Sequence, residues 1–255
     1  MKILVAVPTY NEKDNIGMMI KSVLSLNNNE TVKELNIGIS LVIIDDNSQD
    51  GTQEIVKGFF ASDGKNENAA GFKDNLFLIT RKKKLGLGTA YVSAFRFAIG
   101  KGFDYVITMD CDFSHNPDEI IGFISLMNDR KCGMIVGSRY VGGIRIINWS
   151  MKRLLMSYFA NIYAKLITGV KIDDLTGGFN MYDANCLKRI NLDGINSRGY
   201  AFQIEMKYRM KRAGCDFKEY PIIFYERTKG KSKMSKGIFF EALFAVIRLR
   251  FGLYK

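Results

Sequence analysis

Residues 106–112 read Val-Ile-Thr-Met-Asp-Cys-Asp, an apolar run that ends in two carboxylates one residue apart. The apolar part predicts a buried strand, and residues i and i+2 of a strand point to the same side. Asp110 and Asp112 could therefore offer two oxygen ligands to one Mg²⁺ or Mn²⁺ ion, which completes its shell with water and substrate phosphates. Alone, the pair is better explained by a solvated turn or a helix N-cap, since residues 116–119, Asn-Pro-Asp-Glu, resemble a helix start.

Three further apolar runs are each followed by a polar group and then by a helical pattern of apolar residues. The runs are residues 2–7, 39–44 and 76–79, and the polar groups are Pro8-Thr9-Tyr10-Asn11-Glu12, Asp45-Asp46-Asn47-Ser48 and Arg81-Lys82-Lys83-Lys84. Continuously apolar strands that alternate with helices predict a parallel sheet with helices on both faces. Ligands of such sheets bind outside the carboxyl ends of the strands, where all four polar groups fall.

This joint placement favours a nucleotide site, because a solvated-turn explanation would have to hold independently at four strands. We expect Asp45 to accept a hydrogen bond from a base or ribose hydroxyl and Tyr10 to pack on the base. Arg81 and its neighbours could be simple solvated charge. The Gly-x-Gly at residues 86–88 departs from the P-loop and dinucleotide patterns, which excludes an ATPase or a dehydrogenase.

The second half of the chain continues the pattern with one strand and one long helix. Residues 133–140 predict a fifth strand that brings Arg139 to the same edge of the sheet. Residues 149–168 predict a helix with Arg153 and Ser157 one turn apart. A core helix and a membrane-interface helix explain this segment equally well, because its aromatic and basic residues suit an interface.

Three polar segments downstream leave their roles open. Residues 173–180 form a glycine-bearing loop with two carboxylates of unassigned role. Glu205 could face an acceptor or merely pair with a neighbouring Lys or Arg. Residues 227–233 predict a cationic loop, which is either solvated charge or a lid that closes on a diphosphate.

Length and composition predict a single domain in a reducing compartment. The chain has 255 residues, 47% of them hydrophobic, and residues 61–75 are the clearly biased stretch, which we interpret as a polar surface loop. The four cysteines are scattered and there is one histidine, so no zinc set is indicated. The N-terminus begins directly with a strand-like run instead of a secretory signal, so we expect a cytosolic protein.

The charge distribution predicts an anionic partner at the C-terminal end. The chain carries 37 Lys/Arg against 26 Asp/Glu, and residues 200–255 hold 13 Lys/Arg against five Asp/Glu. Nucleic acid is one candidate partner, but the aromatic and aliphatic residues between Ile238 and Phe251 fit a membrane surface better. Charges interrupt this stretch too often for a transmembrane helix, which needs about 18 apolar residues.

With these residues in view, the chain resembles the dolichol-phosphate mannosyltransferases, inverting glycosyltransferases with the GT-A fold. The resemblance covers nearly the whole length and rests on seven ordered motifs. They are PTYNE at 8–12, DDNSQDGT at 45–52, KKLGLGTAY at 83–91, MDCDFSHNP at 109–117, GSRY at 137–140, DLTGGF at 174–179 and the pair Arg227/Lys233. It implies an α/β fold, a GT-A (Rossmann-like) mostly parallel central sheet flanked by helices, with C-terminal amphipathic membrane-interface helices.

The resemblance also implies an activity and a set of site residues. Mannose would pass from GDP-mannose to dolichyl or another polyprenyl phosphate with inversion, which gives dolichyl β-D-mannosyl phosphate for protein glycosylation and GPI-anchor pathways. The catalytic residues would be Asp110, Asp112 and Arg139, with Asp110 and Asp112 as ligands of Mg²⁺ or Mn²⁺. The donor would contact Pro8, Tyr10, Glu12, Ile43, Asp45, Asp110, Cys111, Asp112, Arg139, Arg227 and Lys233, and the acceptor phosphate would contact Arg139, Arg153 and Ser157.

Three positions depart from the family pattern. Some relatives carry Gln where this chain has Ser114, so a third metal ligand from that side chain is in doubt. Cys111 replaces the usual alanine, with little consequence if only its backbone contacts the donor. Asn180 stands where the family often has Arg, so a sugar or phosphate contact would be missing.

The resemblance further divides the chain and places it in the cell. Residues 1–140 would form the nucleotide-sugar-binding half and residues 141–255 the acceptor and membrane-interface half of one GT-A domain. The chain looks like the soluble form of the family, which depends on small membrane-anchoring subunits. We expect a peripheral protein on the cytosolic face of the endoplasmic reticulum, or of the cell membrane in a prokaryote.

Other functions remain possible at this point. A related transferase could move glucose or another sugar from a different nucleotide to a polyprenyl phosphate. A catalytically silent nucleotide-sugar-binding subunit is a rival of another class, but the intact carboxylates and the cationic loop count against it. Nucleic-acid binding through the basic C-terminal region would be steeply salt-dependent and would need no metal.

Overall fold

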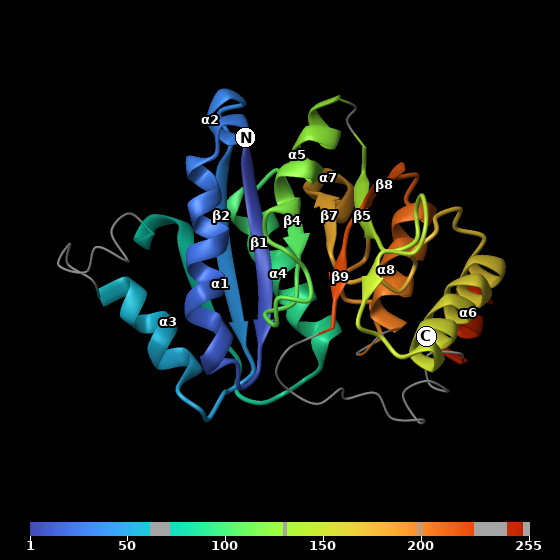
Figure 1. The fold of residues 1–255 in the computed structure, drawn as a ribbon, viewed down its shortest axis with the longest axis horizontal. Helices are drawn as coiled ribbons and strands as arrows, with labels where there is room; N and C mark the ends of the chain where they lie inside the picture. Colours follow the sequence, from blue (N-terminus) through green and yellow to red (C-terminus); the bar gives the residue numbers. More distant parts are fainter. Residues whose placement is uncertain (62–71, 130–131, 198, 200, 227–243, 252–255) are drawn as a thin grey trace.

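A seven-stranded sheet forms the centre of the molecule, and helices cover both of its faces (Figure 1). The computed structural model describes residues 1–61, 72–129, 132–197, 199, 201–226 and 244–251. The strands are β1 (Lys2–Thr9), β2 (Gly38–Asp45), β3 (Leu76–Thr80), β4 (Tyr105–Thr108), β5 (Met134–Ser138), β7 (Asn180–Asp183) and β8 (Phe217–Pro221), in the spatial order β3-β2-β1-β4-β7-β5-β8. A separate two-stranded sheet pairs β6 (Ile146–Ile147) with β9 (Phe224–Tyr225).

The helices follow the alternation predicted from the sequence. They are α1 (Lys13–Ser25), α2 (Glu30–Glu34), α3 (Thr52–Ala61), α4 (Leu87–Lys101), α5 (Glu119–Asp129), α6 (Met151–Thr168), α7 (Ala184–Lys188) and α8 (Ala201–Arg212), with short 3-10 turns η1 (Leu26–Asn28) and η2 (Lys73–Asn75). Residues 244–250 are also helical. Within the described part of the chain, no helix is both long enough and apolar enough to cross a membrane.

Strand directions put the carboxyl ends of most strands on one edge of the sheet. The strands β1, β2, β3 and β4 pair in parallel, and β5 pairs in parallel with β8. Between them β7 runs antiparallel to both β4 and β5. The prediction of a mostly parallel sheet is therefore confirmed. β7 was not predicted, because we interpreted residues 173–180 as a loop.

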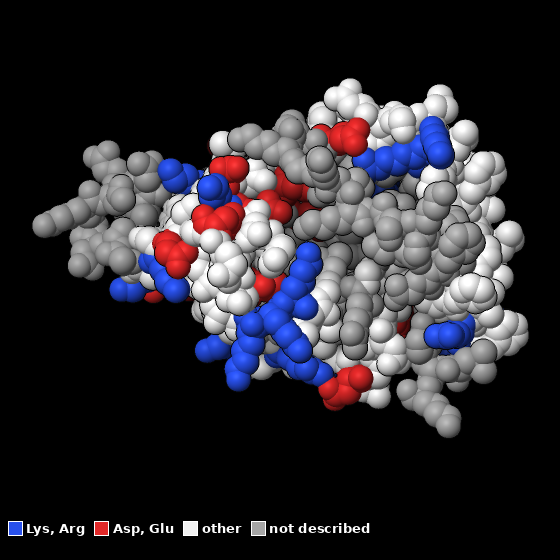
Figure 2. Space-filling model, turned by 90° about the horizontal axis from the view of Figure 1, so that it is seen from below, with Lys and Arg blue, Asp and Glu red and all other residues white. Residues whose placement is uncertain are grey.

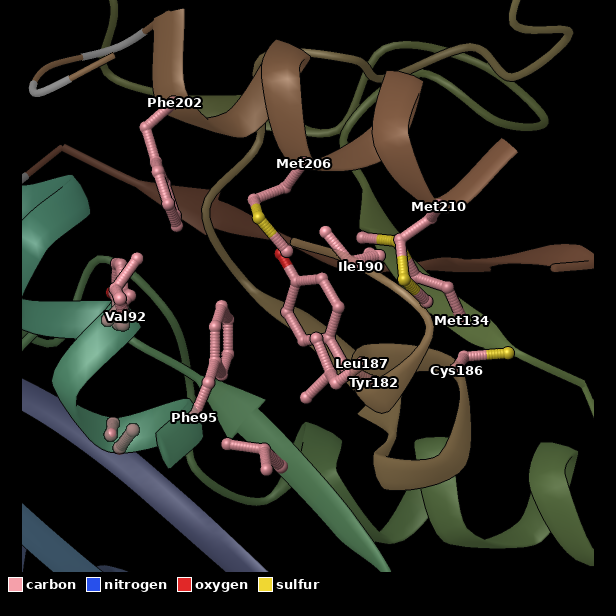
Figure 3. Close-up of a cluster of buried hydrophobic side chains, with 14 of the residues drawn as sticks. Val92, Phe95, Met134, Tyr182, Cys186, Leu187, Ile190, Phe202, Met206 and Met210 are labelled. Carbon is pink, nitrogen blue, oxygen red and sulfur yellow. The ribbon is translucent and has the colours of Figure 1, made fainter. Parts of the chain in front are cut away.

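Two hydrophobic clusters lie on the two faces of the sheet, as the period of two in a strand requires. Ile3 and Val5 of β1 belong to the cluster under α1 and α5, whereas Leu4 and Ala6 belong to the other one. The latter cluster joins α4, α7 and α8 to β5 and β7. Figure 3 shows Tyr182 of β7 at its centre, among side chains from all three helices. The predicted apolar strands β1, β2 and β4 are thus buried on both faces, whereas the edge strand β3 is only partly buried after Leu76.

The predicted ends of two strands need correction. β4 ends at Thr108, two residues before the first carboxylate, so Asp110 and Asp112 lie in a bend instead of on the strand itself. Likewise β5 ends at Ser138 and Arg139 follows it. The carboxylates and Arg139 still leave the same edge of the sheet, since β4 and β5 both run antiparallel to β7.

Helix α6 is not a core helix. It lies at the end of the molecule away from β3 (Figure 1), and its buried residues are limited to Asn161, Ala164 and Thr168. Seven apolar side chains of this helix are exposed, namely Met151, Leu155, Met156, Tyr158, Phe159, Ile162 and Leu166. The helical residues 244–250 and the following residue also expose Phe244, Ile247 and Phe251. Of the predicted segment from Ile238 to Phe251, residues 238–243 lie outside the described residues.

Candidate active site

The loops that follow β1 and β2 are joined by hydrogen bonds between side chains and backbone. The Asn11 N–H donates to Ser48 Oγ at 2.9 Å, and the Glu12 N–H donates to Thr52 Oγ1 at 2.9 Å. In the opposite direction, the Gln49 N–H donates to Asn11 Oδ1 at 3.0 Å. Asn11 adopts a positive φ of 59°, a conformation that Asn tolerates better than most residues. The two predicted polar groups therefore form one joint surface at the carboxyl edge.

Asp45 lies beneath this surface and is fully buried. Its carboxylate accepts hydrogen bonds from Thr9 Oγ1 at 2.9 Å, from the Ser48 N–H at 2.9 Å and hydroxyl at 2.6 Å, and from Gln53 Nε2 at 2.6 Å. The carboxylate thus organises the turn into α3. Ile43 is also fully buried in the sheet, while Pro8 is partly exposed. The contacts of Asp45, Ile43 and Pro8 with a nucleoside stay predictions.

Arg81 is a buried ion-pair residue, so the alternative of simple solvated charge is wrong for it. Its guanidinium contacts Asp46, with 8% and 9% of the two side chains exposed, and also donates to Thr89 Oγ1 at 2.7 Å. The following lysines are exposed, as predicted. The ammonium of Lys84 lies 4.2 Å from the centre of the Tyr10 ring. A cation from the loop after β3 thus reaches the aromatic residue that we expect to pack on a base.

Asp110 and Asp112 are both partly exposed and flank the buried side chain of Cys111. The alternation expected of a strand therefore persists in the bend after β4. Asp112 accepts a hydrogen bond from the Ser114 N–H at 3.0 Å, and Phe113 between them has a φ of 57°. Burial raises the pKa of the Cys111 thiol well above its usual value, and the charges of Glu12, Asp112 and Asp110 raise it further.

These residues fit a divalent cation that prefers oxygen ligands. Two partly exposed carboxylates can bind Mg²⁺ or Mn²⁺ while leaving coordination positions for water and phosphate oxygens. Among the described residues there is no cluster of three or more His, Cys, Asp or Glu side chains with the arrangement of a complete metal site.

Tyr91 of α4 is fully buried. Its ring stacks on Phe202 of α8, with ring centres 5.7 Å apart. Burial raises the pKa of Tyr91 well above its usual value, and the charge of Asp110 is the strongest further contribution. The hydroxyl therefore stays protonated, and it is buried without a hydrogen-bond partner among the described residues. Sequence analysis missed this residue, although Tyr91 belongs to the motif at residues 83–91.

Arg139 is held in a buried, two-pronged ion pair with Asp174. Its Nε donates to one carboxylate oxygen at 2.7 Å, and one terminal nitrogen donates to the other at 2.8 Å and to Thr176 Oγ1 at 2.8 Å. Asp174 is fully buried, which would raise its pKa, but the charge and hydrogen bonds of Arg139 outweigh burial and lower it to about 2. The rings of Tyr140, Trp149 and Phe224 surround the guanidinium.

The loop of residues 173–178 is fixed by side chains from elements distant in the sequence. Asn161 of α6 accepts from the N–H groups of residues 175 and 176, and Glu219 of β8 accepts from those of residues 173 and 174. Lys207 of α8, which is fully buried, donates to the carbonyls of residues 175 and 177. Burial lowers the pKa of Lys207 to about 7, although the Asp174 charge opposes this shift. These contacts fix the loop that carries Asp174, and Asp174 in turn holds Arg139.

These groups together form a polar face at the carboxyl edge of the sheet. Figure 2 looks onto the molecule from below the view of Figure 1, toward the edge where β1 and β2 end. Lys and Arg side chains form a group on this face beside several acidic side chains. Such a mixture suits a substrate with phosphate groups that are shared between a cation and basic residues.

A family model named Glycosyl transferase family 2 matches residues 4–190, which is more than half of the chain. The chain belongs to this family. This match contains the strands β1 to β5, the bend with Asp110 and Asp112, and the loop of residues 173–178. The expectation of a glycosyltransferase with a mostly parallel sheet is thus confirmed.

Two curated proteins resemble this family 2 glycosyltransferase over nearly its whole length. Undecaprenyl-phosphate mannosyltransferase of Micrococcus luteus is 33% identical over 248 residues, which cover 97% of this chain and 93% of the relative. Polyprenol monophosphomannose synthase of Mycolicibacterium smegmatis is 34% identical over 243 residues, which cover 95% of this chain and 84% of the relative. Both relatives are bacterial proteins whose names specify mannose and a polyprenol or its phosphate.

Solved structures confirm the GT-A fold. Glucosyl-3-phosphoglycerate synthase from Mycobacterium tuberculosis, in complex with Mn²⁺, UDP and glucosyl-3-phosphoglycerate, superimposes with a TM-score of 0.67 at 14% identity, covering 98% of this chain and 80% of that one. The same enzyme with Mg²⁺ and UDP gives a TM-score of 0.66 at 15% identity, covering 98% and 79%. At such low identity the likeness concerns the fold alone.

Two residues of this family 2 glycosyltransferase that we expect to contact the acceptor phosphate are bonded to other side chains. Arg153 donates to Glu226 at 2.6 Å and lies 4.0 Å from the Trp149 ring, and Ser157 accepts from the Tyr140 hydroxyl at 2.8 Å. This hydrogen bond thus links Ser157 of α6 to Tyr140, the residue that follows Arg139. Of the other predicted phosphate ligands, Arg227 and Lys233 lie outside the described residues.

The three positions that depart from the family pattern are buried or partly buried. The Ser114 side chain is buried. Cys111 is buried as described above. Asn180 is fully buried and donates to the Gly177 carbonyl at 3.0 Å and to Gln203 at 3.2 Å, so its amide supports the loop of residues 173–178.

Two further charged or titratable residues have structural surroundings in the described part of the chain. Glu205 is fully buried and pairs with Arg209, so the second of its two predicted roles is the one observed. It also accepts from the Ser197 N–H at 2.9 Å. Burial lowers the pKa of His115 to about 4, and its ring stacks on Phe179 with 5.1 Å between ring centres.

Proposed function

We propose that this chain transfers mannose from GDP-mannose to a polyprenyl phosphate, such as dolichyl phosphate, with inversion at the anomeric carbon. The observation that carries this proposal is the full-length similarity to two bacterial proteins named for mannose transfer to a polyprenyl phosphate or synthesis of polyprenol monophosphomannose. The bend with Asp110 and Asp112 supports it, because a nucleoside diphosphate donor needs a cation at its phosphates. GDP as the nucleotide rests on the family resemblance.

On the donor side, we assign nucleoside contacts to the surface formed by the loops after β1 and β2. Pro8, Tyr10, Glu12, Ile43 and Asp45 are the proposed nucleoside contacts. Asp110 and Asp112 would hold Mg²⁺ or Mn²⁺ with the donor diphosphate, alongside Cys111. The bound cation would supply Lewis-acid stabilisation of the leaving diphosphate. The buried hydroxyl of Tyr91, whose pKa is raised by the charge of Asp110, would donate to that carboxylate and keep it oriented when the cation is bound.

On the acceptor side, the nucleophile is an oxygen of the acceptor phosphate. The second pKa of a phosphate monoester is about 6, so this oxygen is anionic at neutral pH and no strong base is required. Arg139, Arg153 and Ser157 are the proposed contacts of this phosphate, with Arg227 and Lys233 contributing to the donor phosphates and sugar. Their positive charges would reduce the repulsion between two anionic substrates.

A polyprenyl phosphate resides in a membrane, so we assign the exposed apolar face of α6 to contact with the lipid surface. Phe159 and Leu166 of this face are 62% and 77% exposed. Lys152 and Lys165 on the same helix are exposed too, and basic residues favour anionic lipid headgroups. Both named relatives are bacterial, which favours the cell membrane over the endoplasmic reticulum and gives no support to a GPI-anchor pathway. Small anchoring subunits remain a proposal from the family resemblance.

Transfer of radiolabelled mannose tests the reaction directly. The purified chain is incubated with GDP-mannose and undecaprenyl phosphate in detergent, with and without Mg²⁺ or Mn²⁺, and UDP-glucose serves as the control donor. We expect a mannolipid that forms only with GDP-mannose and only with the metal. Product from UDP-glucose instead would assign the chain to polyprenyl-phosphate glucosyl transfer.

Asp112→Ala tests the assignment of the metal site in the same assay. Loss of a group that stabilises charge in the transition state lowers kcat by about 10²–10³-fold. Asp118→Ala, which removes an exposed carboxylate downstream of the bend, is the control and should leave the rate within about twofold. Full turnover by Asp112→Ala would contradict the assignment.

A further inference from the structure

The loop of residues 173–178 obtains its shape from side chains of other elements, not from a regular hydrogen-bond ladder. Four consecutive N–H groups, those of residues 173 to 176, donate to Glu219 or Asn161 at distances between 2.8 and 3.1 Å. The next N–H, of Gly177, donates to Asp174 at 2.8 Å. Movement of any supporting side chain would therefore move the loop backbone, because buried N–H groups are costly to leave without partners.

Asn161 is the member of this set that belongs to α6. It is 4% exposed, and its side chain uses both ends. The carbonyl oxygen accepts from the N–H groups of Leu175 at 2.8 Å and Thr176 at 3.1 Å, and the amide nitrogen donates to Thr176 Oγ1 at 3.2 Å. Thr176 Oγ1 in turn accepts from the Arg139 guanidinium at 2.8 Å. A chain of three side chains therefore leads from α6 to Arg139.

The first ten residues of α6 are held at the protein surface, whereas Ala164 and Thr168 near its end are buried. Residues 151–160 include no buried side chain, and their outward face is apolar. Ser157 is bonded to Tyr140, and Arg153 to Glu226. Of these four residues Tyr140 is buried and the other three are partly exposed. Asn161 thus provides the buried polar attachment of this helix.

We propose that Asn161 is a positioning residue that couples α6 to the loop of residues 173–178, so that a lipid-bound α6 sets the position of Arg139 for an acceptor phosphate at the membrane surface. This inference rests on the proposed function, in which α6 contacts lipid and Arg139 contacts the acceptor. Lipid contact restricts the motion of α6, and the two hydrogen bonds to the loop backbone transmit that restriction. An acceptor that is free in water does not depend on the position of Arg139 relative to the membrane surface.

The first test compares two acceptors with the variant Asn161→Ala. One acceptor is undecaprenyl phosphate in vesicles of phosphatidylglycerol and phosphatidylethanolamine, and the other is water-soluble citronellyl phosphate. We expect kcat/KM of the variant to fall about tenfold with the vesicle acceptor and to change by less than about twofold with the soluble acceptor, because misplacement matters only where the membrane fixes the phosphate. Thr168→Val is the matched control. Thr168 is also buried on α6, but bonds only to Ala164 and Val170.

Equal losses with both acceptors, or no loss with either, would overturn the proposal, since a merely structural role of Asn161 would not distinguish them. Activity of the wild type with both acceptors would at the same time establish the proposed function. If the wild type forms product with neither acceptor, the proposed function fails, and the second test then decides the coupling by itself.

The second test measures hydrogen exchange of the wild type and of Asn161→Ala with and without the same vesicles. In the wild type we expect vesicles to slow exchange in α6 and also at the N–H groups of residues 174–177. In the variant the slowing should be confined to α6. Vesicles that leave α6 unchanged in the wild type, or that slow α6 without the loop, would overturn the proposal even where the variant fails to fold.

Discussion

The two sides of the active edge are held together in different ways. On the donor side, the loops after β1 and β2 exchange hydrogen bonds between short polar side chains and backbone N–H groups, as between Ser48 and Asn11. On the acceptor side, the loop of residues 173–178 depends on buried charged groups, with Asp174 against Arg139 and Lys207 close by.

This difference determines how each side should respond to mutation. Short side chains that bond to the backbone of an adjacent loop can be lost one at a time, since each contributes roughly 1 kcal/mol. A buried ion pair behaves otherwise, because the loss of one member leaves the other charged and without water. Loss of a short side chain such as Ser48 should therefore cost less than loss of Asp174. The buried ion pair of Arg81 with Asp46 is one place on the donor side where loss of a charge should also be costly.

The largest effect on stability is expected for Asp174→Asn. This change leaves the buried guanidinium of Arg139 without its partner, so the free energy of unfolding in urea should fall by about 3–5 kcal/mol. Asp173→Asn is the control, because the ion pair of Asp173 with Lys165 leaves 47% and 44% of the two side chains exposed. Screening by solvent limits its effect to about 1 kcal/mol or less. If both variants lose the same free energy of unfolding, the buried ion pair of Asp174 has no special weight, and the contrast between the two sides is wrong.

Acid should weaken the acceptor side through the same carboxylate. The pKa of Asp174 is lowered from 3.8 to about 2, so the folded state binds this proton at a lower pH than the unfolded state does. The resulting stability, about 2 kcal/mol from that shift, is fully present above about pH 4 and is lost as the pH falls toward 2. Urea titrations at about pH 5 and about pH 2.5 should show this loss in the wild type and a smaller one in Asp174→Asn. If the free energy of unfolding falls equally in both proteins between the two pH values, groups other than Asp174 cause the acid sensitivity.

On the donor side, Tyr91→Phe should weaken binding of the metal without harming the fold. Removal of a group that orients a metal ligand raises the dissociation constant of the metal by about tenfold or more. We would measure free Mn²⁺ by electron paramagnetic resonance in the presence of GDP. Tyr182→Phe makes the same chemical change at another fully buried tyrosine, whose hydroxyl lies by Met206 in Figure 3. If both variants bind Mn²⁺ equally, Tyr91 has no special role at Asp110.

The smallest effect is expected for Lys84→Ala. The Lys84 ammonium lies over the Tyr10 ring on an exposed loop, where a cation contributes about 0.5–1 kcal/mol. Loss of this charge should raise the dissociation constant of GDP-mannose about twofold to fivefold at low salt, and by less at high salt. Lys82→Ala removes an exposed charge from the same loop. A weakening of equal size in Lys82→Ala would show that net charge matters and contact with Tyr10 does not.

The features that sequence analysis predicted depend on residues close to one another in the chain. Each polar group directly follows its apolar strand, so the parallel order of β1, β2 and β4 brought the groups to one edge as expected. Asp110 and Asp112 were found for the same reason. Arg81 was misjudged because its partner Asp46 belongs to the loop of another strand, and a run of basic residues is usually solvated.

The features that were missed depend on partners far apart in the chain. β7 has only four residues, Asn180–Asp183, two of them polar, so no alternation marked it as a strand. The supports of the loop of residues 173–178 come from α6, α8 and β8, and nothing near Asn161, Lys207 or Glu219 in the sequence distinguishes them from ordinary surface residues. A buried lysine is especially hard to foresee, since most lysines are exposed.

The antiparallel strand β7 has a consequence for how such a protein can diversify. Val136 of β5 pairs with Asn180 of β7, so residues 139–179 leave the sheet and return to it at neighbouring positions on the same edge. This segment, with α6, is a cassette whose two ends are fixed by one pair of strands. Insertions or exchanges within the cassette leave the strand order and the nucleotide side intact. Under the proposed function, exchanging residues 140–179 while Arg139 is kept should alter the acceptor contacts and leave the loops after β1 and β2 in place.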